Sequence, residues 1–239
     1  MTEFMPHLAP VVALLFFGTI LLMGACFLVL LYGAVRRSSF FAKLAAGVAF
    51  ATAAGYFILL TSVSVASSEK VLPPGGWKVF CDIDCHTWYS VAGMQVATAL
   101  GAGMQQTAAN GQFVIVRLKT WFNENTISPH RGNRPLVPGP RRVLLVDSSG
   151  RSFGISSKGQ SALAAMGDSS TPLDQALRPG ESFTSDFVFD VPPDTHGLRL
   201  LVADGDSPTR LVIGHENSFL HKKIYLGLDS APQLTKTAR

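Results

Sequence analysis

Charged side chains are missing from two long stretches near the start of the chain. Residues 10–35 and 44–68 contain no Asp, Glu, Lys or Arg. A helix needs about 20 apolar residues to cross a hydrocarbon core of roughly 30 Å, and both stretches are long enough. Their lack of ionisable groups argues against a proton or ion path through these segments alone. The sequence therefore predicts a transmembrane hairpin over residues 1–68, surrounded by the lipid bilayer.

Acidic residues are also absent from the linker between the two stretches. Residues 36–43 carry Arg36, Arg37 and Lys43 and no negative charge. Basic loops are retained on the cytoplasmic side, so both chain ends are expected outside the cytoplasm. We therefore expect a protein of the bacterial inner (plasma) membrane with an extracytoplasmic C-terminal domain. The small residues of both stretches predict either packing of the two helices on each other or an assembly surface for another membrane subunit.

Several functional classes lack their sequence signals. The chain has 20 Lys and Arg against 16 Asp and Glu, and this surplus is too small to predict a nucleic-acid partner. No G-x-S-x-G motif and no glycine-rich phosphate loop is present, and residues 67–70 spell S-x-x-K without the motifs that accompany it in β-lactamases. A non-catalytic protein is therefore expected.

Alternating apolar and polar residues dominate the second part of the chain. They predict strands over residues 87–91, 112–122, 142–146, 151–155, 182–191, 198–202, 210–213 and 223–228, with one short helix over 160–166. Phe187 and Phe189 are expected to face the core. Many strands with little helix predict an all-β antiparallel sandwich over 78–230, after a stalk at 69–77 and before a flexible tail at 231–239.

Three groups of residues carry a family resemblance. They are Gly111–Val116, then Val143–Asp147 with Gly150, and Leu177–Glu181 leading into Phe187–Pro192. Over residues 111–203 the chain resembles a bacterial extracellular immunoglobulin-like domain family of unknown function. The resemblance implies an immunoglobulin-like sandwich outside the cytoplasm and no catalytic residues.

Cysteine is scarce, and two of the three cysteines stand beside a histidine. Cys26 lies in the first apolar stretch, where a thiol packs as a small apolar group. Cys81, Cys85 and His86 form the pattern C-x-x-x-C-H, for which four interpretations remain open. The cysteines form a disulfide, or they bind c-type haem with His86 as axial ligand, or they bind copper or zinc, or they are unpaired structural thiols.

The copper interpretation has a second, architectural resemblance. Two N-terminal spans before an external β-domain are similar to cytochrome oxidase subunit II, whose copper site uses C-x-x-x-C. The chain departs from that motif, since position 89 is Tyr and position 92 is Ala. The leading expectation is therefore that no cofactor is bound, with c-type haem or copper as the alternative.

Two further groups of polar residues are candidate sites. His215, Glu216 and His221 resemble a zinc-binding helix motif, but Phe219 replaces its second histidine, so either a metal site completed by His86 or a polar loop bonded to backbone is expected. Residues 123–140 form an unusually long connection that carries His130, Arg131 and Arg134. Such a loop is either a recognition loop or an ordered Ω-type loop.

These features predict a membrane-anchored extracytoplasmic binding or assembly module, with another membrane or envelope protein as its partner. The alternative is a membrane-bound redox protein that carries haem or copper at Cys81, Cys85 and His86.

Overall fold

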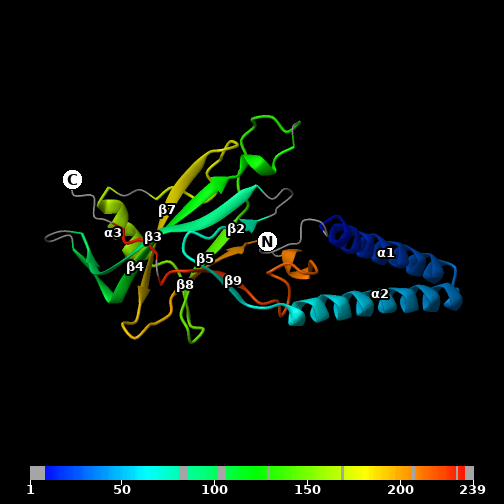
Figure 1. The fold of residues 1–239 in the computed structure, drawn as a ribbon. Coiled ribbons are helices and arrows are strands. Elements are labelled where there is room, and N and C mark those ends of the chain that lie inside the picture. The colour runs from blue at the N-terminus through cyan, green and yellow to red at the C-terminus, as the bar shows by residue number, and fades with distance from the viewer. Residues whose placement is uncertain are drawn as a thin grey trace. The chain divides into compact units, whose positions relative to one another are not determined.

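The chain divides into two units, which Figure 1 shows as a helical hairpin and a β-sheet region. The structure, a computed structural model, describes residues 9–80, 86–101, 106–128, 130–167, 170–205, 208–229 and 231–234. The hairpin unit comprises Glu3–Ser68 and Asp206–Lys222, and the sheet unit comprises Glu69–Gly205 and Lys223–Arg239. A late segment of the chain therefore belongs with the N-terminal helices.

Two long helices form the hairpin. They are α1 (Ala9–Val35) and α2 (Ser39–Ala66). The expected linker of residues 36–43 is shorter than predicted, because residues 39–43 contain no helix-breaking residue and α2 begins at Ser39. The turn is closed by the Ser38 amide, which donates to the Gly33 carbonyl at 2.9 Å. Cys26 is buried with a free thiol, as expected of an apolar packing residue.

Most glycines of the hairpin do not lie at the contact between its helices. A Cβ added at Gly18, Gly24, Gly47 or Gly55 would meet no atom within 4 Å. At Gly33, beside the turn, it would lie 3.2 Å from the Ala42 backbone nitrogen. Close helix approach therefore requires glycine only at the turn, and the other small residues leave the alternative of an assembly surface as a prediction.

Strands make up most of the sheet unit, as the alternation of residues predicts. Its elements are β1 (Lys70–Leu72), β2 (Lys78–Phe80), β3 (Thr87–Leu100), β4 (Thr107–Phe122), β5 (Arg141–Val146), β6 (Ser152–Phe153), α3 (Ser157–Ala165), β7 (Ser182–Val191), β8 (Arg199–Asp204) and β9 (Ile224–Gly227). One sheet has the order β1-β9-β8-β5-β6 and the other β2-β3-β4-β7. The pairs are antiparallel except β1 with β9, which is parallel.

Apolar side chains from both sheets share one core. Phe189 is fully buried there, and Phe187 packs against it from the same face of β7. The inward facing predicted for both residues is confirmed. The core continues with Val114, Val116 and Leu118 from β4 and with Val143, Leu145, Leu200, Val202 and Leu226 from the second sheet.

Helix α3 covers the outer face of the four-stranded sheet, where it packs on Phe113, Ile115 and Val188. A Cβ at Gly159 would lie 2.5 Å from Val188 Cγ1, so the helix approaches the sheet more closely than another residue allows. It begins three residues before the predicted start because the Ser156 hydroxyl caps it, accepting from the Gly159 amide at 3.1 Å.

Several other parts of the chain differ from the prediction. β2 was not predicted, β3 continues beyond the predicted end at 91 to Leu100, and β4 begins at Thr107 instead of 112. Residues 210–213 are not a strand, since Pro208–Leu211 is a 3₁₀ helix followed by turns. The expected stalk contains β1, whose Lys70 is in register with Ile224 of β9. Residues 231–234 of the expected flexible tail lie along β3, where the Leu234 amide donates to the Met94 carbonyl at 3.1 Å.

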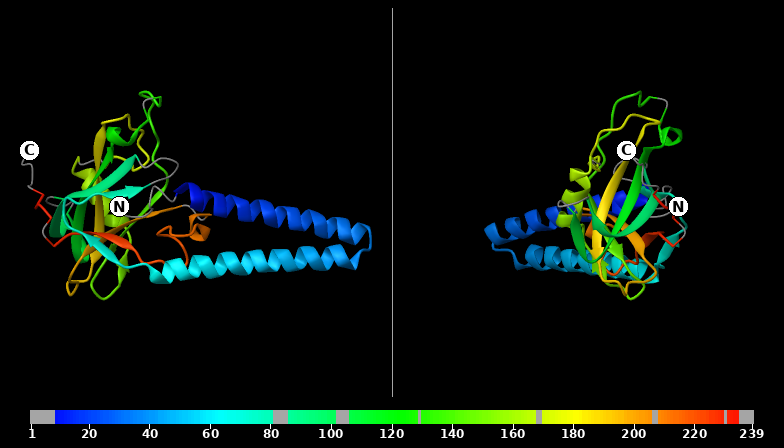
Figure 2. Two further views of the ribbon diagram at one scale, coloured as in Figure 1. Left: turned by 45° about the vertical axis from the view of Figure 1, so that its right-hand side comes forward. Right: turned by 90° about the vertical axis from the view of Figure 1, so that its left-hand side faces the viewer.

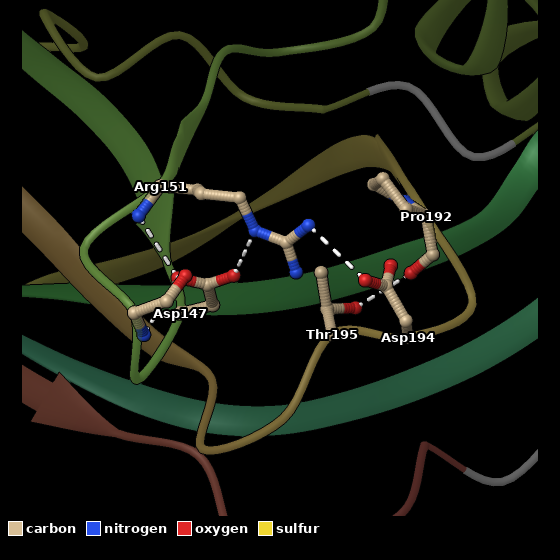
Figure 3. Close-up of polar contacts among 6 residues, drawn as sticks. Asp147, Arg151, Pro192, Asp194 and Thr195 are labelled. Atoms are coloured by element: carbon tan, nitrogen blue, oxygen red, sulfur yellow. Dashed lines mark hydrogen bonds and ion pairs between the residues drawn. The ribbon is translucent and has the colours of Figure 1, made fainter.

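One buried carboxylate fixes the turn between β5 and β6 (Figure 3). Asp147 Oδ1 accepts from the Ser149 and Arg151 amides at 3.0 and 2.9 Å, and Oδ2 accepts from Arg151 Nε at 2.6 Å. Arg151 also reaches Asp194, in the connection from β7 to β8, at 3.2 Å. Burial alone would raise the pKa of Asp147, but the hydrogen bonds from Ser149 and Arg151 and the nearby guanidinium lower that pKa to about 2.

Replacing Asp147 with Asn should destabilise the sheet unit in a pH-dependent way. The folded pKa lies below the ordinary value of 3.8, so the ionised carboxylate stabilises the fold above about pH 4 and this contribution is lost as the pH falls toward 2. The difference in melting temperature between the wild type and Asp147→Asn should therefore be largest near neutral pH and shrink in acid. Tryptophan fluorescence of the full chain in detergent measures it, because all three tryptophans lie in the sheet unit.

The matched control is Asp194→Asn, since the Asp194 side chain is 67% exposed and contacts the same arginine. It should change the melting temperature little at any pH. A difference for Asp147→Asn that does not vary with pH would contradict this account of the carboxylate.

Candidate functional site

The loop at residues 123–140 begins where β3 and β4 meet. The Asn123 amide donates to the His86 carbonyl at 2.9 Å, and thereby extends the pairing of Thr87 with Phe122 by one bond. The Asn123 side chain then accepts from the Asn125 amide at 3.0 Å and caps the short 3₁₀ helix Glu124–Thr126. The first turn of the loop is therefore fixed to the sheet by backbone and side chain together.

His86 is held in one orientation beneath this turn. Its side chain is almost completely buried, and Nδ1 lies 2.6 Å from Thr126 Oγ1. The Thr126 hydroxyl is hydrogen-bonded to the Asn123 carbonyl at 2.7 Å. The same hydroxyl is hydrogen-bonded to His86 Nδ1, and which of the two atoms donates depends on the tautomer of the imidazole.

Phe122 joins His86 to the basic part of the loop. The rings of His86 and Phe122 are stacked, with centroids 5.1 Å apart. The Arg131 guanidinium lies over the Phe122 ring at 4.7 Å and donates to the Arg134 carbonyl at 2.7 Å. The structure thus brings together His86 and Arg131, which the sequence predicted as parts of two separate candidate sites.

The far end of the loop is attached to a second connection. Leu136 and Leu177 exchange two backbone hydrogen bonds, of 2.7 and 2.9 Å. The neighbouring turn is fixed by the Arg178 amide, which donates to Glu181 Oε2 at 2.8 Å, and by the Gly180 amide, which donates to the Phe122 carbonyl at 3.0 Å. Between these anchors the loop, in green, extends beyond the ends of the strands (Figures 1 and 2).

The middle of the loop presents basic groups to solvent. His130 and Arg134 are exposed and Arg131 is half-buried against Phe122. Within the described part of the chain, the Arg134 guanidinium makes no hydrogen bond or ion pair. The middle of the loop is therefore an ordered platform with exposed basic groups, while the acidic Glu124 is exposed at the start of the loop.

The other predicted site residues are only partly described. Cys81 and Cys85 lie outside the described residues, so the disulfide and the cofactor alternatives stay predictions. Among the residues that the structure describes, no three His, Cys, Asp or Glu side chains form a group that could hold a metal. His215, Glu216 and His221 lie in the hairpin unit and His86 in the sheet unit, so a metal site shared by all four stays a prediction.

The local contacts of those histidines agree with a polar loop bonded to backbone. His215 Nδ1 accepts from the Asn217 amide at 3.0 Å, and His221 Nδ1 lies 2.7 Å from the Lys222 carbonyl. His215 Nδ1 is therefore occupied by a backbone donor and is not available as a metal ligand in this arrangement.

Two side-chain clusters in the sheet unit were not predicted from the sequence. Trp77, Trp88 and Trp121 pack together with ring centroids 5.4 to 6.3 Å apart, and Lys119 Nζ lies 5.9 Å from the Trp77 ring. Trp88 and Trp121 are direct cross-strand partners, which only the register of β3 and β4 could have shown.

The second cluster surrounds Lys78, which is fully buried. Its Nζ donates to the carbonyls of Val202 and Ile224 at 2.6 and 2.8 Å and lies 5.2 Å from the Phe80 ring. The side chain connects β2 of one sheet to β8 and β9 of the other. From sequence, a lysine in a short strand is expected to face solvent, so the sequence did not predict that Lys78 would be buried between the two sheets.

Comparisons with known proteins do not assign a family. No family model and no curated protein matches the chain. The secreted protein MPT63 of Mycobacterium tuberculosis is similar with a TM-score of 0.41 and 13% identity, over 68% of this chain and 99% of that one. A conserved hypothetical protein from Bacillus anthracis is similar with a TM-score of 0.39 and 16% identity, over 52% of this chain and 86% of that one. Neither similarity is strong enough to bear on function.

Proposed function

We propose that this protein is a membrane-anchored binding or assembly module whose sheet unit lies outside the cytoplasm. The observation that supports the anchor is the exposure of large apolar side chains along both helices, including Leu14 at 74%, Leu21 at 74% and Phe50 at 77%. Such surfaces are unfavourable in water and are covered when the helices span a bilayer. α1 and α2 are 27 and 28 residues long, which is sufficient to cross it.

The orientation follows from the charges at the hairpin turn. Arg36 and Arg37 lie in the turn and Lys43 lies in the first turns of α2, with no acidic residue among them. Basic residues at the end of a span are retained in the cytoplasm. The sheet unit is then extracytoplasmic, in the compartment where immunoglobulin-like sandwiches are displayed as binding modules. Two facing, mainly antiparallel sheets with one core support that finer assignment.

A reporter enzyme that is active only in the cytoplasm should be silent when it is fused after Arg239. The same reporter fused after Arg37, at the hairpin turn, should be active and serves as the control. Activity measured in intact cells, normalised to the amount of fusion protein, distinguishes the two. Strong activity of the C-terminal fusion would overturn the orientation and the compartment together.

Within this module, the loop at 123–140 is the proposed recognition surface. The observation that carries it is the fixed position of a positive group, because Arg131 is held over Phe122 while the loop is attached at Asn123 and Leu136. A fixed loop loses little conformational entropy on binding. His130 and Arg134 are exposed beside it, which favours an acidic surface of another membrane or envelope protein as the partner.

Charge reversal at Arg134 should disrupt this partnership. A photoactivatable residue at Val137, which is 63% exposed in the same loop, should give a discrete protein adduct in cells. Arg134→Glu in that background should lower the adduct yield by about tenfold or more, since like charges in an interface cost more than 1.4 kcal/mol.

Lys158→Glu provides the matched control. Lys158 is also an exposed cation of the sheet unit, but it lies on α3. Its reversal should leave the adduct yield unchanged. Equal yields from the Arg134 variant and the parent would refute the loop as the recognition surface.

A redox function at Cys81, Cys85 and His86 is the second candidate. The observation that favours it is the fixed orientation of His86, whose Nδ1 is hydrogen-bonded to Thr126 Oγ1 at 2.6 Å, because a hydrogen bond at one ring nitrogen orients a histidine that binds a metal through the other. An absorption spectrum with metal analysis, on protein made together with c-type maturation machinery, tests this candidate. A haem band or stoichiometric copper that is lost in His86→Ala supports it, and a mass two hydrogens below the reduced chain without either signal excludes it.

A further inference from the structure

We infer that residues 208–222 form a third membrane-contacting element, which lies in the outer leaflet beside the hairpin and contacts phospholipid. The inference rests on the proposed membrane anchor and adds to it a segment that comes late in the chain. Figures 1 and 2 show this segment, in orange, beside the helix ends remote from the hairpin turn. The sequence alone predicted a strand in this region, over residues 210–213.

The backbone of the segment satisfies many of its own hydrogen bonds. The amides of Val212, His215, Ser218 and His221 each donate to the carbonyl three residues earlier, at 2.9 to 3.2 Å. The Ser218 hydroxyl adds a bond to the Val212 carbonyl. Non-helical backbone at membrane depth is tolerated only when its polar groups find partners within the protein. The consecutive turns provide such partners for several of the backbone groups, whereas an isolated strand would provide none.

Two side chains, one in α2 and one directly after it, fasten the segment at different depths. The Tyr56 hydroxyl donates to the Leu211 carbonyl at 2.6 Å, and Ser67 Oγ accepts from the Lys222 amide at 2.8 Å. Tyr56 lies ten residues before the end of α2 at Ala66, which corresponds to about 15 Å along the helix axis.

The depth of Tyr56 places Leu211 within the apolar layer. About 20 residues of α2 span the hydrocarbon core, so a span that begins after Lys43 reaches approximately Val63. Tyr56 is therefore inside the outer leaflet, and a carbonyl at that level needs a protein donor. Leu211 also lines an apolar groove with residues of both helices, among them Phe16, Ile20, Met23, Phe57 and Leu60.

The outward face of the segment suits a phospholipid surface. Its exposed residues are apolar or basic, and include Leu211, Phe219 and Leu220, which are 55 to 58% exposed. Arg210 and Lys222 are exposed near its two ends, whereas the acidic Glu216 is completely buried. Apolar side chains flanked by cations fit the boundary between acyl chains and phosphate groups.

The backbone at Leu220 gives an additional argument. Its φ is 65°, in the left-handed region that bulky residues rarely adopt. Gly or Asn adopts this backbone conformation at a lower energetic cost than Leu, so either would be expected at a position exposed to water. Contact of the leucine side chain with lipid provides a reason for an apolar residue there.

Photocross-linking to lipid tests the inference on the full chain. p-Benzoylphenylalanine replaces Phe219, and the protein is reconstituted in vesicles of phosphatidylethanolamine and phosphatidylglycerol. After irradiation, intact-mass analysis should show addition of one phospholipid. The yield should be severalfold higher than at Ile155, an apolar residue of the sheet unit that is 44% exposed.

Phe57, which is 56% exposed on α2, is the positive control for the anchor. A lipid adduct at position 57 with no more adduct at 219 than at 155 would overturn this inference and leave the anchor intact. No adduct at 57 or at 219 would overturn both together. Because residue 219 is exposed, its replacement by an aromatic analogue should not prevent folding, which the melting temperature checks.

Discussion

The arrangement of this chain depends on one constraint: polar groups that are withdrawn from water must find partners inside the protein. The two long helices of the hairpin unit meet it because their backbone hydrogen bonds are internal. In residues 208–222, consecutive turns and the hydroxyl groups of Tyr56 and Ser67 provide partners for several backbone groups. In the sheet unit, Lys78 meets it by donating to two carbonyls of the opposite sheet.

The same constraint explains why the candidate recognition loop is ordered. His86 is almost completely buried, and its Nδ1 is hydrogen-bonded to Thr126 Oγ1, which also bonds to the Asn123 carbonyl. Each bond fixes the next one along the loop. Arg131 is then held over Phe122, so the exposed cations stand on a support that extends into the core. For the proposed recognition role, this means that the loop needs little reordering when a partner binds.

The hairpin unit and the sheet unit divide the proposed tasks. The hairpin unit provides the anchor and, with residues 208–222, a contact with the outer leaflet. The sheet unit presents the 123–140 loop and the His86 region, which carry the binding and redox candidates respectively. The chain leaves the hairpin unit after α2, returns to it after β8 and leaves again before β9. The chain therefore passes between the two units three times.

Local pattern was enough to identify the helices and most of the strands. The absence of charge over 10–35 and 44–68 predicted the two helices, and the alternation over 182–191 predicted β7 with its inward Phe189. Both follow from the hydrophobic pattern of residues that are adjacent in the sequence. Tertiary structure decided the rest. Four features depend on contacts between residues far apart in sequence. They are the turns at 208–222, the pairing of Trp88 with Trp121, the burial of Lys78 and the packing of His86 and Arg131 on the same Phe122 ring. The local sequence pattern does not indicate which distant carbonyl or ring a side chain will contact, so these features could be identified only from the tertiary structure.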